Sequence, residues 1–250
     1  MDEFVGKVAI ITGATKGIGR TAALLFAKKG IYVVAAGRTE ALGRSLQEQV
    51  QEQGGKLLFV KTDVRVQEQV QHLVLRAKET FGGVDYAFNN AGVFCKMSSL
   101  VDIEEGDWNQ VMETNLRGVW YCLKYELPEI FLRKGAIVNM STSRTQRGAV
   151  GMGAYLASKA GIEALTRVAS IEGSPYGVRV NTLHPGPVDD SLLHTKIPEK
   201  QIEDLKKKNP LNKLATKEEI AQAALWLLSS EAGHINGTSL CIDGGESLII

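Results

Sequence analysis

The fold of this chain is decided by the stretch K-V-A-I-I-T-G-A-T-K-G-I-G, residues Lys7 to Gly19. Residues 7–12 form a short apolar run rich in β-branched side chains, and a glycine closes it, which predicts a buried strand. The residues that follow, up to Gly30, place apolar side chains at near-helical spacing and stop at a glycine, which predicts a helix. A strand followed directly by a helix is the first half of a βαβ crossover unit.

The same alternation continues along the rest of the chain. Further strands are expected at residues 31–36, 57–61, 84–89, 136–140, 178–183 and 239–242. Further helices are expected at 41–53, at 67–81, at 108–132 with a break or end near Pro128, from Tyr155 to about 172, and at 217–229, with an irregular stretch before Leu211. Seven strands that alternate with helices predict a doubly wound α/β Rossmann fold, with a seven-stranded parallel sheet and helices on both faces. Because no linker composition or internal repeat interrupts the pattern, residues 1–250 are expected to form a single domain, with a substrate loop at about 186–211.

The composition limits the classes of function. The 250 residues carry a formal net charge of +1, which argues against nucleic acid and against an anionic membrane as partners. A small-molecule partner is therefore expected. The cysteines are scattered, no stretch approaches 18 consecutive apolar residues, and the chain opens without a signal sequence, so a cytoplasmic location is expected. The histidines show no metal-ligand spacing, so we expect no metal site and a surface or loop position for each of them.

The loop between the first strand and the first helix carries Gly13, Gly17 and Gly19 in the pattern G-x-x-x-G-x-G. Glycines there permit a tight turn and a close approach of the backbone to a ligand, while the helix N-terminus offers free N–H groups to a pyrophosphate. The spacing differs from the common G-x-G-x-x-G fingerprint, and a glycine-rich turn without a ligand is the alternative. In its strand–helix context, the loop predicts a dinucleotide site.

The end of the second predicted strand bears on the choice of dinucleotide. An acidic residue there would bind the ribose hydroxyls of NAD, whereas an arginine accommodates the extra phosphate of NADP. The sequence reads Gly37-Arg38-Thr39, with no carboxylate before Glu40, and Lys16 lies in the glycine loop. Arg38 and Lys16 could both face a 2′-phosphate, so NADP(H) is favoured over NAD(H); ordinary solvated charges are the alternative.

Tyr155 and Lys159 lie four residues apart in a predicted helix, so they share one face. A nearby ammonium favours the phenolate, which is expected to lower the pKa of the Tyr155 phenol towards the range of a useful acid/base. Because Y-x-x-x-K alone is common, an ordinary surface pair is the alternative. The remaining motifs decide between the two.

Several further motifs accompany these features. They are Asp63-Val64 after the third strand, Asn89-Asn90-Ala91-Gly92 after the fourth, Asn115 in the long helix, Pro185-Gly186, and Asp243-Gly244-Gly245 near the end. In this order and at these strand ends, the motifs resemble the classical short-chain dehydrogenase/reductase family over essentially the whole chain. The resemblance implies an NAD(P)-dependent oxidoreductase that acts on CH–OH groups and transfers a hydride between NADP(H) and a carbonyl or alcohol substrate.

The resemblance also implies roles for individual residues. Tyr155 is expected to be the general acid/base, Lys159 to lower its pKa and bind the nicotinamide ribose, and Asn115 to hold a water of the proton relay. Asp63 would contact the adenine, and Val188 the nicotinamide carboxamide. The full set of implied cofactor contacts is Gly13, Thr15, Lys16, Gly17, Ile18, Gly19, Arg38, Asp63, Val64, Asn90, Ala91, Gly92, Tyr155, Lys159, Pro185, Gly186 and Val188.

Two positions depart from the family pattern. The family serine that binds the substrate carbonyl falls, thirteen residues before the tyrosine, on Thr142, which offers the same hydroxyl donor. We therefore expect Thr142 in this role, with the neighbouring Ser143 as the alternative. The family often has threonine two residues past Val188, and here Asp190 stands there, which leaves the cofactor contacts of that loop open.

Substrate selection is expected in three segments, residues 93–100, 144–153 and 188–211. Arg144, Gln146 and Arg147 lie in the second segment and favour a sugar, a hydroxy acid or an oxoacyl compound over a steroid; solvated loop arginines are the alternative. Two other functions stay open: an NAD(H)-dependent sugar or hydroxy-acid dehydrogenase of the same family, and a non-catalytic dinucleotide-binding sensor. The resemblance of the helices at 108–132 and 155–172 to the family's dimer surfaces implies a homo-oligomer, either a tetramer or a dimer.

Overall fold

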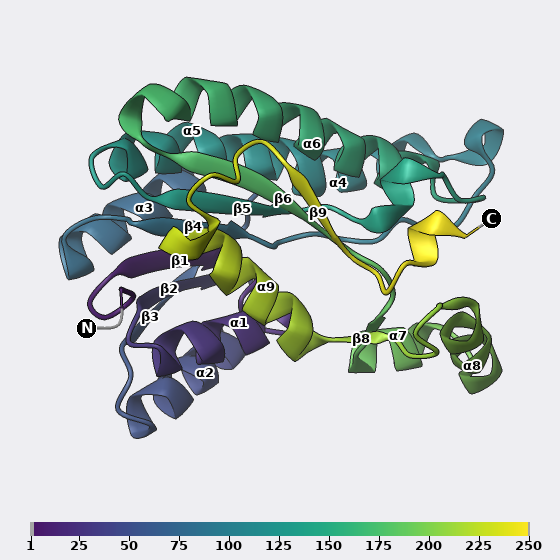
Figure 1. Cartoon of the computed structure of the whole chain (residues 1–250), viewed down its shortest axis with the longest axis horizontal. Coiled ribbons are helices and arrows are strands. Elements are labelled where there is room, and N and C mark those ends of the chain that lie inside the picture. Colours follow the sequence, from purple (N-terminus) through teal and green to yellow (C-terminus); the bar gives the residue numbers. More distant parts are fainter. Residues whose placement is uncertain (1–2, 250) are drawn as a thin grey trace.

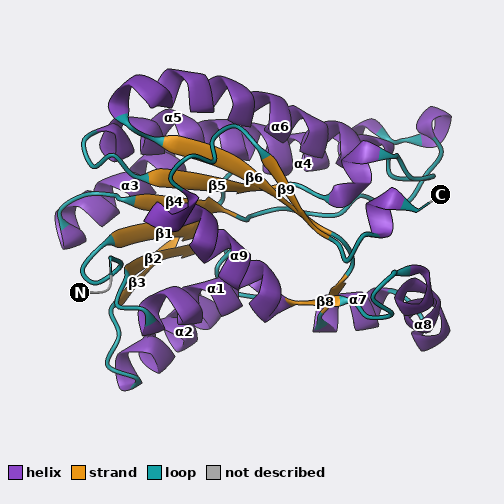
Figure 2. Cartoon of the chain, in the orientation of Figure 1, coloured by secondary structure: helices purple, strands orange, loops and turns teal. Residues whose placement is uncertain are grey.

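The computed structural model of the chain describes residues 3–249, except for the side chains of Ser191, Leu192 and Lys196. Its centre is a parallel sheet with the strand order β3-β2-β1-β4-β5-β6-β9 (Figures 1 and 2). The strands of this sheet are β1 (Val8–Thr12), β2 (Tyr32–Gly37), β3 (Leu57–Lys61), β4 (Tyr86–Asn89), β5 (Ala136–Met140), β6 (Arg179–Pro185) and β9 (Ser239–Ile242). The predicted doubly wound α/β fold with a seven-stranded parallel sheet is confirmed.

Helices cover both faces of the sheet (Figure 1). Buried side chains of α1, α2 and α9 belong to one apolar cluster, and those of α3, α5 and α6 belong to another. The helices are α1 (Gly17–Lys28), α2 (Glu40–Glu52), α3 (Gln67–Phe81), α4 (Glu105–Val111), α5 (Gly118–Phe131), α6 (Gly153–Gly173), α7 (Ser191–Lys196), α8 (Glu199–Lys208) and α9 (Lys217–Leu228).

Strand β1 shows how the sequence produces this layered core. All of its residues are buried, and successive side chains enter opposite clusters: Ala9 and Ile11 pack with α1, whereas Val8 and Ile10 pack with α3. A strand covered on both faces has no polar side, so its sequence is a continuous apolar run instead of an alternating one. The buried strand predicted from the apolar run at the start of the sequence is therefore confirmed.

The parallel arrangement brings the carboxyl ends of the strands to one edge of the sheet. Strand β1 lies between β2 and β4, so the direction in which strands are added reverses beside it. Doubly wound folds bind their ligands at this switch point, outside the carboxyl ends of the strands. The loops that follow β1, β4, β5 and β6 carry most of the predicted site residues, and the fold gathers them at this edge.

The helix predicted at 108–132 is continuous, and Pro128 does not end it. Helix α4 passes through a π-helical segment, η2 (Met112–Arg117), into α5, which extends to Phe131. Pro128 lies in the last turn of α5. Its missing N–H therefore removes one backbone hydrogen bond close to a helix end, where the loss does not stop the helix.

The segment before Leu211 was predicted to be irregular, and this prediction is wrong. It contains β7 (Val188–Asp189), which pairs with β8 (Ala215–Thr216), and the helices α7 and α8. Ile202 is the buried residue of α8, and most of the helix is charged, so the apolar periodicity that would announce it is nearly absent. Throughout residues 3–249, no helix is long and apolar enough to span a membrane.

Candidate active site

The glycine loop after β1 packs tightly against the loop after β4. Gly13 has φ of +65°, and a Cβ on it would lie 2.9 Å from the Ala91 Cα atom; a Cβ on Gly19 would lie 2.3 Å from the Gly13 carbonyl oxygen. Asn90 donates from Nδ2 to the Thr12 carbonyl oxygen at 3.1 Å, and the Ala91 N–H donates to Thr12 Oγ1 at 3.1 Å. These contacts leave no room for side chains at the two glycines, so the sequence requirement here is steric.

The start of helix α1 has no capping side chain of its own. The helix begins at Gly17, its N-cap Lys16 makes no side-chain capping bond, and no acidic residue of the helix lies in its first turn. Its first N–H groups and the positive end of its dipole are therefore available. This arrangement is compatible with the pyrophosphate site that the glycine pattern predicts. Ile18 is half-buried behind the loop and packs against the α1 side of the core.

The residues predicted at the adenosine end lie after β2 and β3. Thr15 packs on Gly37, where a Cβ would lie 2.7 Å from the Thr15 Cγ2 atom. Arg38 and Lys16 are both exposed, and no ion pair is found for either within the described part of the chain. The first carboxylate after β2, Glu40, is bound by Arg44 at 2.6 Å.

Asp63 and Val64 lie after β3. Arg65 binds the Asp63 carboxylate at 2.6 Å and holds its pKa below the ordinary value, and Arg38 acts in the same direction. Val64 is buried and packs on Gly118, where a Cβ would lie 2.8 Å from the Val64 Cγ2 atom. The Asp63 carboxylate is thus already engaged by a neighbouring arginine, which the sequence pattern did not predict.

Tyr155 and Lys159 share one environment in the first half of α6, and the surface-pair alternative is wrong. Lys159 is 3% exposed, its Nζ atom donates to the Met140 carbonyl oxygen at 2.8 Å, and Nζ lies 5.7 Å from the centre of the Tyr155 ring. Tyr155 is half-buried and packs against Phe94, with 4.9 Å between ring centres. The phenol and the ammonium therefore meet at the carboxyl end of β5.

The pKa values of the pair differ from the expectation. Burial raises the pKa of Tyr155 to about 12, Cys95 adds to the rise, and Arg144 opposes it. Burial also lowers the pKa of Lys159 to about 8. The expected lowering of the Tyr155 pKa is therefore wrong. Desolvation of the phenol outweighs the attraction of the Lys159 ammonium, which is itself desolvated and donates to the Met140 carbonyl oxygen.

Asn115 lies in the π-helical segment η2 and holds the loop after β4. Its Oδ1 atom accepts from the Val93 N–H at 2.8 Å, and its Nδ2 atom donates to the Val93 carbonyl oxygen at 2.9 Å and to Ser158 Oγ at 3.1 Å. A Cβ on Gly92 would lie 3.3 Å from Asn115 Oδ1 and 3.5 Å from Lys159 Nζ. Asn115 and Lys159 therefore both lie beside Gly92.

The hydroxyl groups of Ser141 and Thr142, at the end of β5, contact different parts of the protein. Ser141 donates to Glu163 Oε1 at 3.1 Å and to the Lys159 carbonyl oxygen at 3.3 Å, so its hydroxyl faces α6. Thr142 donates weakly to the Pro185 carbonyl oxygen at 3.5 Å and accepts from the Arg144 N–H at 3.4 Å. Thr142 thus lies beside the end of β6, and Ser143 follows it as a buried residue.

The arginines predicted to face an anionic substrate are instead bound within the protein. Glu246 Oε1 accepts from Arg144 at 3.0 Å and from Arg147 at 2.8 Å, and Glu246 itself is buried. Its other oxygen, Oε2, is buried without a hydrogen-bond partner. Gln146 donates to Cys241 Sγ at 3.2 Å. The substrate preference inferred from these arginines therefore loses its support, and Glu246 is a site residue that sequence reasoning missed.

The loop after β6 brings Pro185, Gly186 and Val188 to the same edge. Pro185 is buried, and Val188 is half-buried in β7. A Cβ on Gly186 would lie 2.9 Å from the Asp243 Cβ atom. Asp243 accepts from the N–H groups of Gly245 and Ser247, so the D-G-G motif forms a structured turn against Pro185-Gly186.

The predicted surface or loop position is wrong for one histidine, His184. His184 is fully buried in β6, with Nε2 3.1 Å from Thr182 Oγ1, and burial lowers its pKa. Its place in a central strand explains this, because every residue there from Val180 to Pro185 is buried. Among the described residues, no group of three or more His, Cys, Asp or Glu side chains could hold a metal ion.

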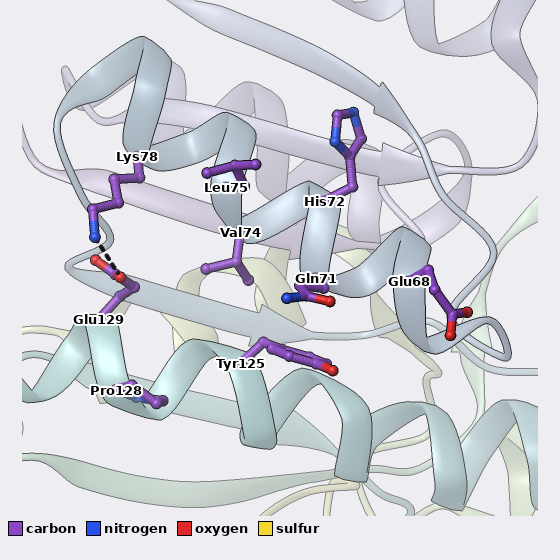
Figure 3. A pocket seen from close by; sticks show the side chains of 9 residues that line it. All are labelled: Glu68, Gln71, His72, Val74, Leu75, Lys78, Tyr125, Pro128 and Glu129. Atoms are coloured by element: carbon purple, nitrogen blue, oxygen red, sulfur yellow. Dashed lines mark hydrogen bonds and ion pairs between the residues drawn. The ribbon is translucent and has the colours of Figure 1, made fainter.

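A groove of about 450 Å³ lies away from these residues, between α3 and α5 (Figure 3). His72 and Tyr125 line it, and Lys78 and Glu129 form an ion pair of 2.9 Å at one end. None of the predicted site residues lies among its lining residues. The predicted site is therefore defined by the strand ends.

Comparisons with known proteins were made with this geometry in hand. A family model described as enoyl-(acyl carrier protein) reductase matches residues 13–247. The short chain dehydrogenase/reductase astE of Aspergillus oryzae is 38% identical over 250 residues, which cover 98% of this chain and 96% of that protein. A cyclohexanol dehydrogenase of an Acinetobacter species is 34% identical over 97% of this chain and 96% of its own. A 3beta-hydroxysteroid dehydrogenase of Mediterraneibacter gnavus is 34% identical over 98% of this chain and 96% of its own.

Among solved structures, a crystal structure from Agrobacterium tumefaciens, provisionally assigned as a gluconate dehydrogenase, superposes with a TM-score of 0.94. It covers 99% of this chain and 98% of its own, at 24% identity, and this likeness concerns the fold. The match over residues 13–247 and the relatives at 34–38% identity establish the family. The chain belongs to the short-chain dehydrogenase/reductase family of oxidoreductases, which use a nicotinamide dinucleotide.

Proposed function

We propose that this protein transfers a hydride between NADP(H) and an alcohol or carbonyl substrate, with Tyr155 as the general acid/base. One observation carries the proposal: a half-buried phenol and a buried lysine lie 5.7 Å apart at the carboxyl edge of the sheet, the edge that also carries the loop in which Gly13 and Gly19 leave no room for side chains. The bound dinucleotide would supply the hydride chemistry. The protein's own residues would hold the substrate oxygen and manage its proton.

The phenol of Tyr155 is suited to donate a proton. With a pKa of about 12, it is protonated at neutral pH. In carbonyl reduction, Tyr155 and Thr142 would both donate hydrogen bonds to the substrate oxygen, and Tyr155 would then pass its proton to that oxygen. Ser143 is the alternative second donor, whereas Ser141 is committed to Glu163.

Lys159 and Asn115 would support this proton transfer. Lys159 keeps a carbonyl partner on Met140, and an ammonium has three N–H donors, so two are left for the nicotinamide ribose. Asn115, like Lys159, lies beside Gly92 and would hold a water of the relay. The sensor alternative has less support, because a chain without turnover has no need of the buried lysine, whose desolvation is costly.

The preference for NADP(H) is supported by charge at the adenosine end. Arg38 and Lys16 are exposed, while the nearby carboxylates of Glu40 and Asp63 are bound by Arg44 and Arg65. Two exposed cations beside carboxylates that are already paired favour the 2′-phosphate of NADP(H) over the free ribose hydroxyl of NAD(H). NAD(H) is the alternative, and it would need one of these carboxylates to leave its arginine.

Tyr155 packs against a small apolar cluster. Phe94 packs on the phenol, the exposed Met97 and Val150 lie in the predicted substrate segments, and Arg144 and Arg147 are bound to Glu246. We therefore propose an apolar secondary alcohol or its ketone as the substrate class. Relatives named for cyclohexanol and for a 3beta-hydroxysteroid agree with this choice. A sugar or hydroxy acid is the second candidate.

We also propose that residues 1–250 act as one catalytic domain within a homo-oligomer in the cytoplasm. A groove of about 620 Å³ lies between η2, α5 and α6, and Trp120, Val168 and Ile171 of these helices are exposed. Such a surface suits a second copy of the chain in a dimer or tetramer. The free thiols Cys95, Cys122 and Cys241 suit a reducing compartment. Light scattering that shows a stable monomer would contradict the oligomer.

The proposed function is tested with Tyr155→Phe. Purified protein is assayed with cyclohexanone, cyclohexanol, a steroid ketone, gluconate and glucose, by NADPH and NADH absorbance. The variant is expected to lose turnover by at least ~10²-fold, the lower end of general acid/base effects, while its Kd for NADPH stays within about threefold of the wild type. Turnover near the wild-type rate would contradict the role of Tyr155. Turnover by the wild type with none of the cyclohexyl or steroid compounds would contradict the substrate class.

A further inference from the structure

Asp190 brings a carboxylate against the glycine loop. Its side chain is half-buried, and a Cβ built on Gly17 would lie 3.3 Å from the Asp190 Oδ2 atom. Gly17 is the first residue of α1 and has φ of +52°. The carboxylate therefore lies beside the backbone of the loop itself, although the two residues are far apart in the sequence.

This position suits an anion. No side-chain cap is present at the start of α1, and the first turn of the helix has no acidic residue. The free N–H groups and the positive end of the dipole attract the Asp190 carboxylate. The same groups would bind the pyrophosphate of a dinucleotide. The carboxylate and the pyrophosphate therefore compete for one electrostatic position.

Asp190 is also fixed by the segment that it begins. Its Oδ1 atom accepts from the Leu193 N–H at 2.9 Å and so caps α7. Before Asp190 in the sequence, β7 pairs with β8. After it, Ile202 of α8 is buried, and Asn209, which follows α8, donates to the Asp243 carbonyl oxygen at 2.7 Å. Because both flanks are anchored, moving the carboxylate away from the loop requires α7 to move or lose its cap.

We propose that Asp190 is an anionic latch that weakens binding of the dinucleotide pyrophosphate and forces α7 to shift when the cofactor enters. This inference rests on the proposed function, which places the pyrophosphate at the glycine loop. The threonine that the family often has at this position is uncharged, so the repulsion is a property of this chain. Salt screens part of the repulsion, which makes the penalty largest at low ionic strength.

The test compares Asp190→Asn and Asp190→Thr with the wild type. Asparagine removes the charge and remains a good N-cap, so α7 keeps its start. Asp189→Asn is the matched control, because Asp189 is exposed, binds His194 at 2.7 Å and carries the same charge one residue earlier. Kd is measured by calorimetry at low and high salt, with NADPH, NADH, ADP-ribose, which has the pyrophosphate, and 2′-AMP, which lacks it.

Asp190→Asn is expected to bind NADPH and ADP-ribose ~3- to 10-fold more tightly than the wild type at low salt, with a smaller gain at high salt. Binding of 2′-AMP, and all binding by Asp189→Asn, should be unchanged. Equal or weaker NADPH binding by both Asp190 variants would overturn the latch and leave the proposed function intact. An equal gain for 2′-AMP would also overturn it, because the effect would not involve the pyrophosphate. A wild-type protein that binds neither dinucleotide would overturn the proposed function and the latch together.

Discussion

Replacement of Glu126 by glutamine is expected to stabilise the protein at alkaline pH. Glu126 is fully buried in α5, its Oε2 atom accepts from Asn89 Nδ2 at 2.9 Å, and its Oε1 atom has no partner. Asn89 Nδ2 also donates to Asn139 Oδ1 at 3.0 Å, while the buried Asn89 Oδ1 atom has no partner. A carboxylate in this network faces one shared donor and a large desolvation cost.

Burial raises the pKa of Glu126 from 4.5 to about 7, against the hydrogen bond from Asn89, which lowers it. A folded pKa above the unfolded value means that the stability contribution is fully present below about pH 4.5 and is lost as the pH rises through about 7. At about 1.4 kcal/mol for each pH unit between the two pKa values, the loss is roughly 3 kcal/mol above pH 8. Glutamine does not titrate. Its amide oxygen can accept from Asn89 Nδ2, and its NH₂ group is a hydrogen-bond donor, which the carboxylate lacks.

The assay is urea denaturation at a fixed protein concentration from pH 5 to pH 9. The Glu126→Gln variant should match the wild type within about 1 kcal/mol at pH 5 and exceed it by roughly 2–3 kcal/mol at pH 9. Glu129→Gln is the control: it lies on the same helix and is bound by Lys78 at 2.9 Å near the surface, so its effect should be below about 1 kcal/mol at every pH. A difference between Glu126→Gln and the wild type that does not grow with pH would refute the reasoning.

Three further outcomes are expected. Thr142→Val removes the hydroxyl at nearly constant volume and should lower kcat ~10²- to 10³-fold, because the substrate oxygen loses one hydrogen-bond donor. The kcat of Ser143→Ala should stay within about threefold of the wild type, and the reverse order of the two variants would assign the role to Ser143. Arg38→Ala should weaken NADPH binding by ~10-fold or more and leave the Kd for NADH nearly unchanged, since a charged hydrogen bond to a 2′-phosphate is worth about 1.5–3 kcal/mol. Equal losses of affinity for both dinucleotides would contradict the proposed preference for NADP(H). Glu246→Ala should lower the free energy of unfolding by about 1–3 kcal/mol, measured in urea, because Arg144 and Arg147 lose their shared acceptor; an unchanged midpoint would show that solvent replaces it.

The strands were predictable from the sequence because burial on both faces leaves a strong signal. The run at residues 136–140 is buried throughout and apolar except for Asn139, and its bounds were predicted correctly. Helix α8 left almost no signal, because Ile202 is its buried residue and its polar face is mixed in charge. Pro128 misled the prediction in the opposite direction, since a proline in a last turn removes one hydrogen bond near an end that is already open.

The candidate site was predictable where a motif follows a strand end. Lys159 lies near the Tyr155 ring because the two residues are one turn apart on α6, and the Gly92 motif after β4 lies beside both Asn115 and Lys159. Glu246 was not predictable, because its partners lie about a hundred residues earlier in the sequence, and no local pattern records which arginine a carboxylate binds. The contact between Asp190 and Gly17 is of the same kind: the departure at Asp190 was visible, and its neighbour was not.

Spacing alone could not predict the pKa of the Tyr155 phenol, because desolvation acts on both Tyr155 and Lys159. Burial favours the neutral form of each group, so the Tyr155 pKa rises to about 12 and the Lys159 pKa falls to about 8. The phenol therefore keeps its proton at neutral pH, which suits carbonyl reduction; alcohol oxidation needs a phenolate and hence more positive charge nearby. Arg144 is the group that lowers the Tyr155 pKa, and its guanidinium is bound by the buried Glu246. The carboxylate of Glu246 thus binds the guanidinium group that lowers the Tyr155 pKa, although Glu246 lies outside every motif recognised in the sequence.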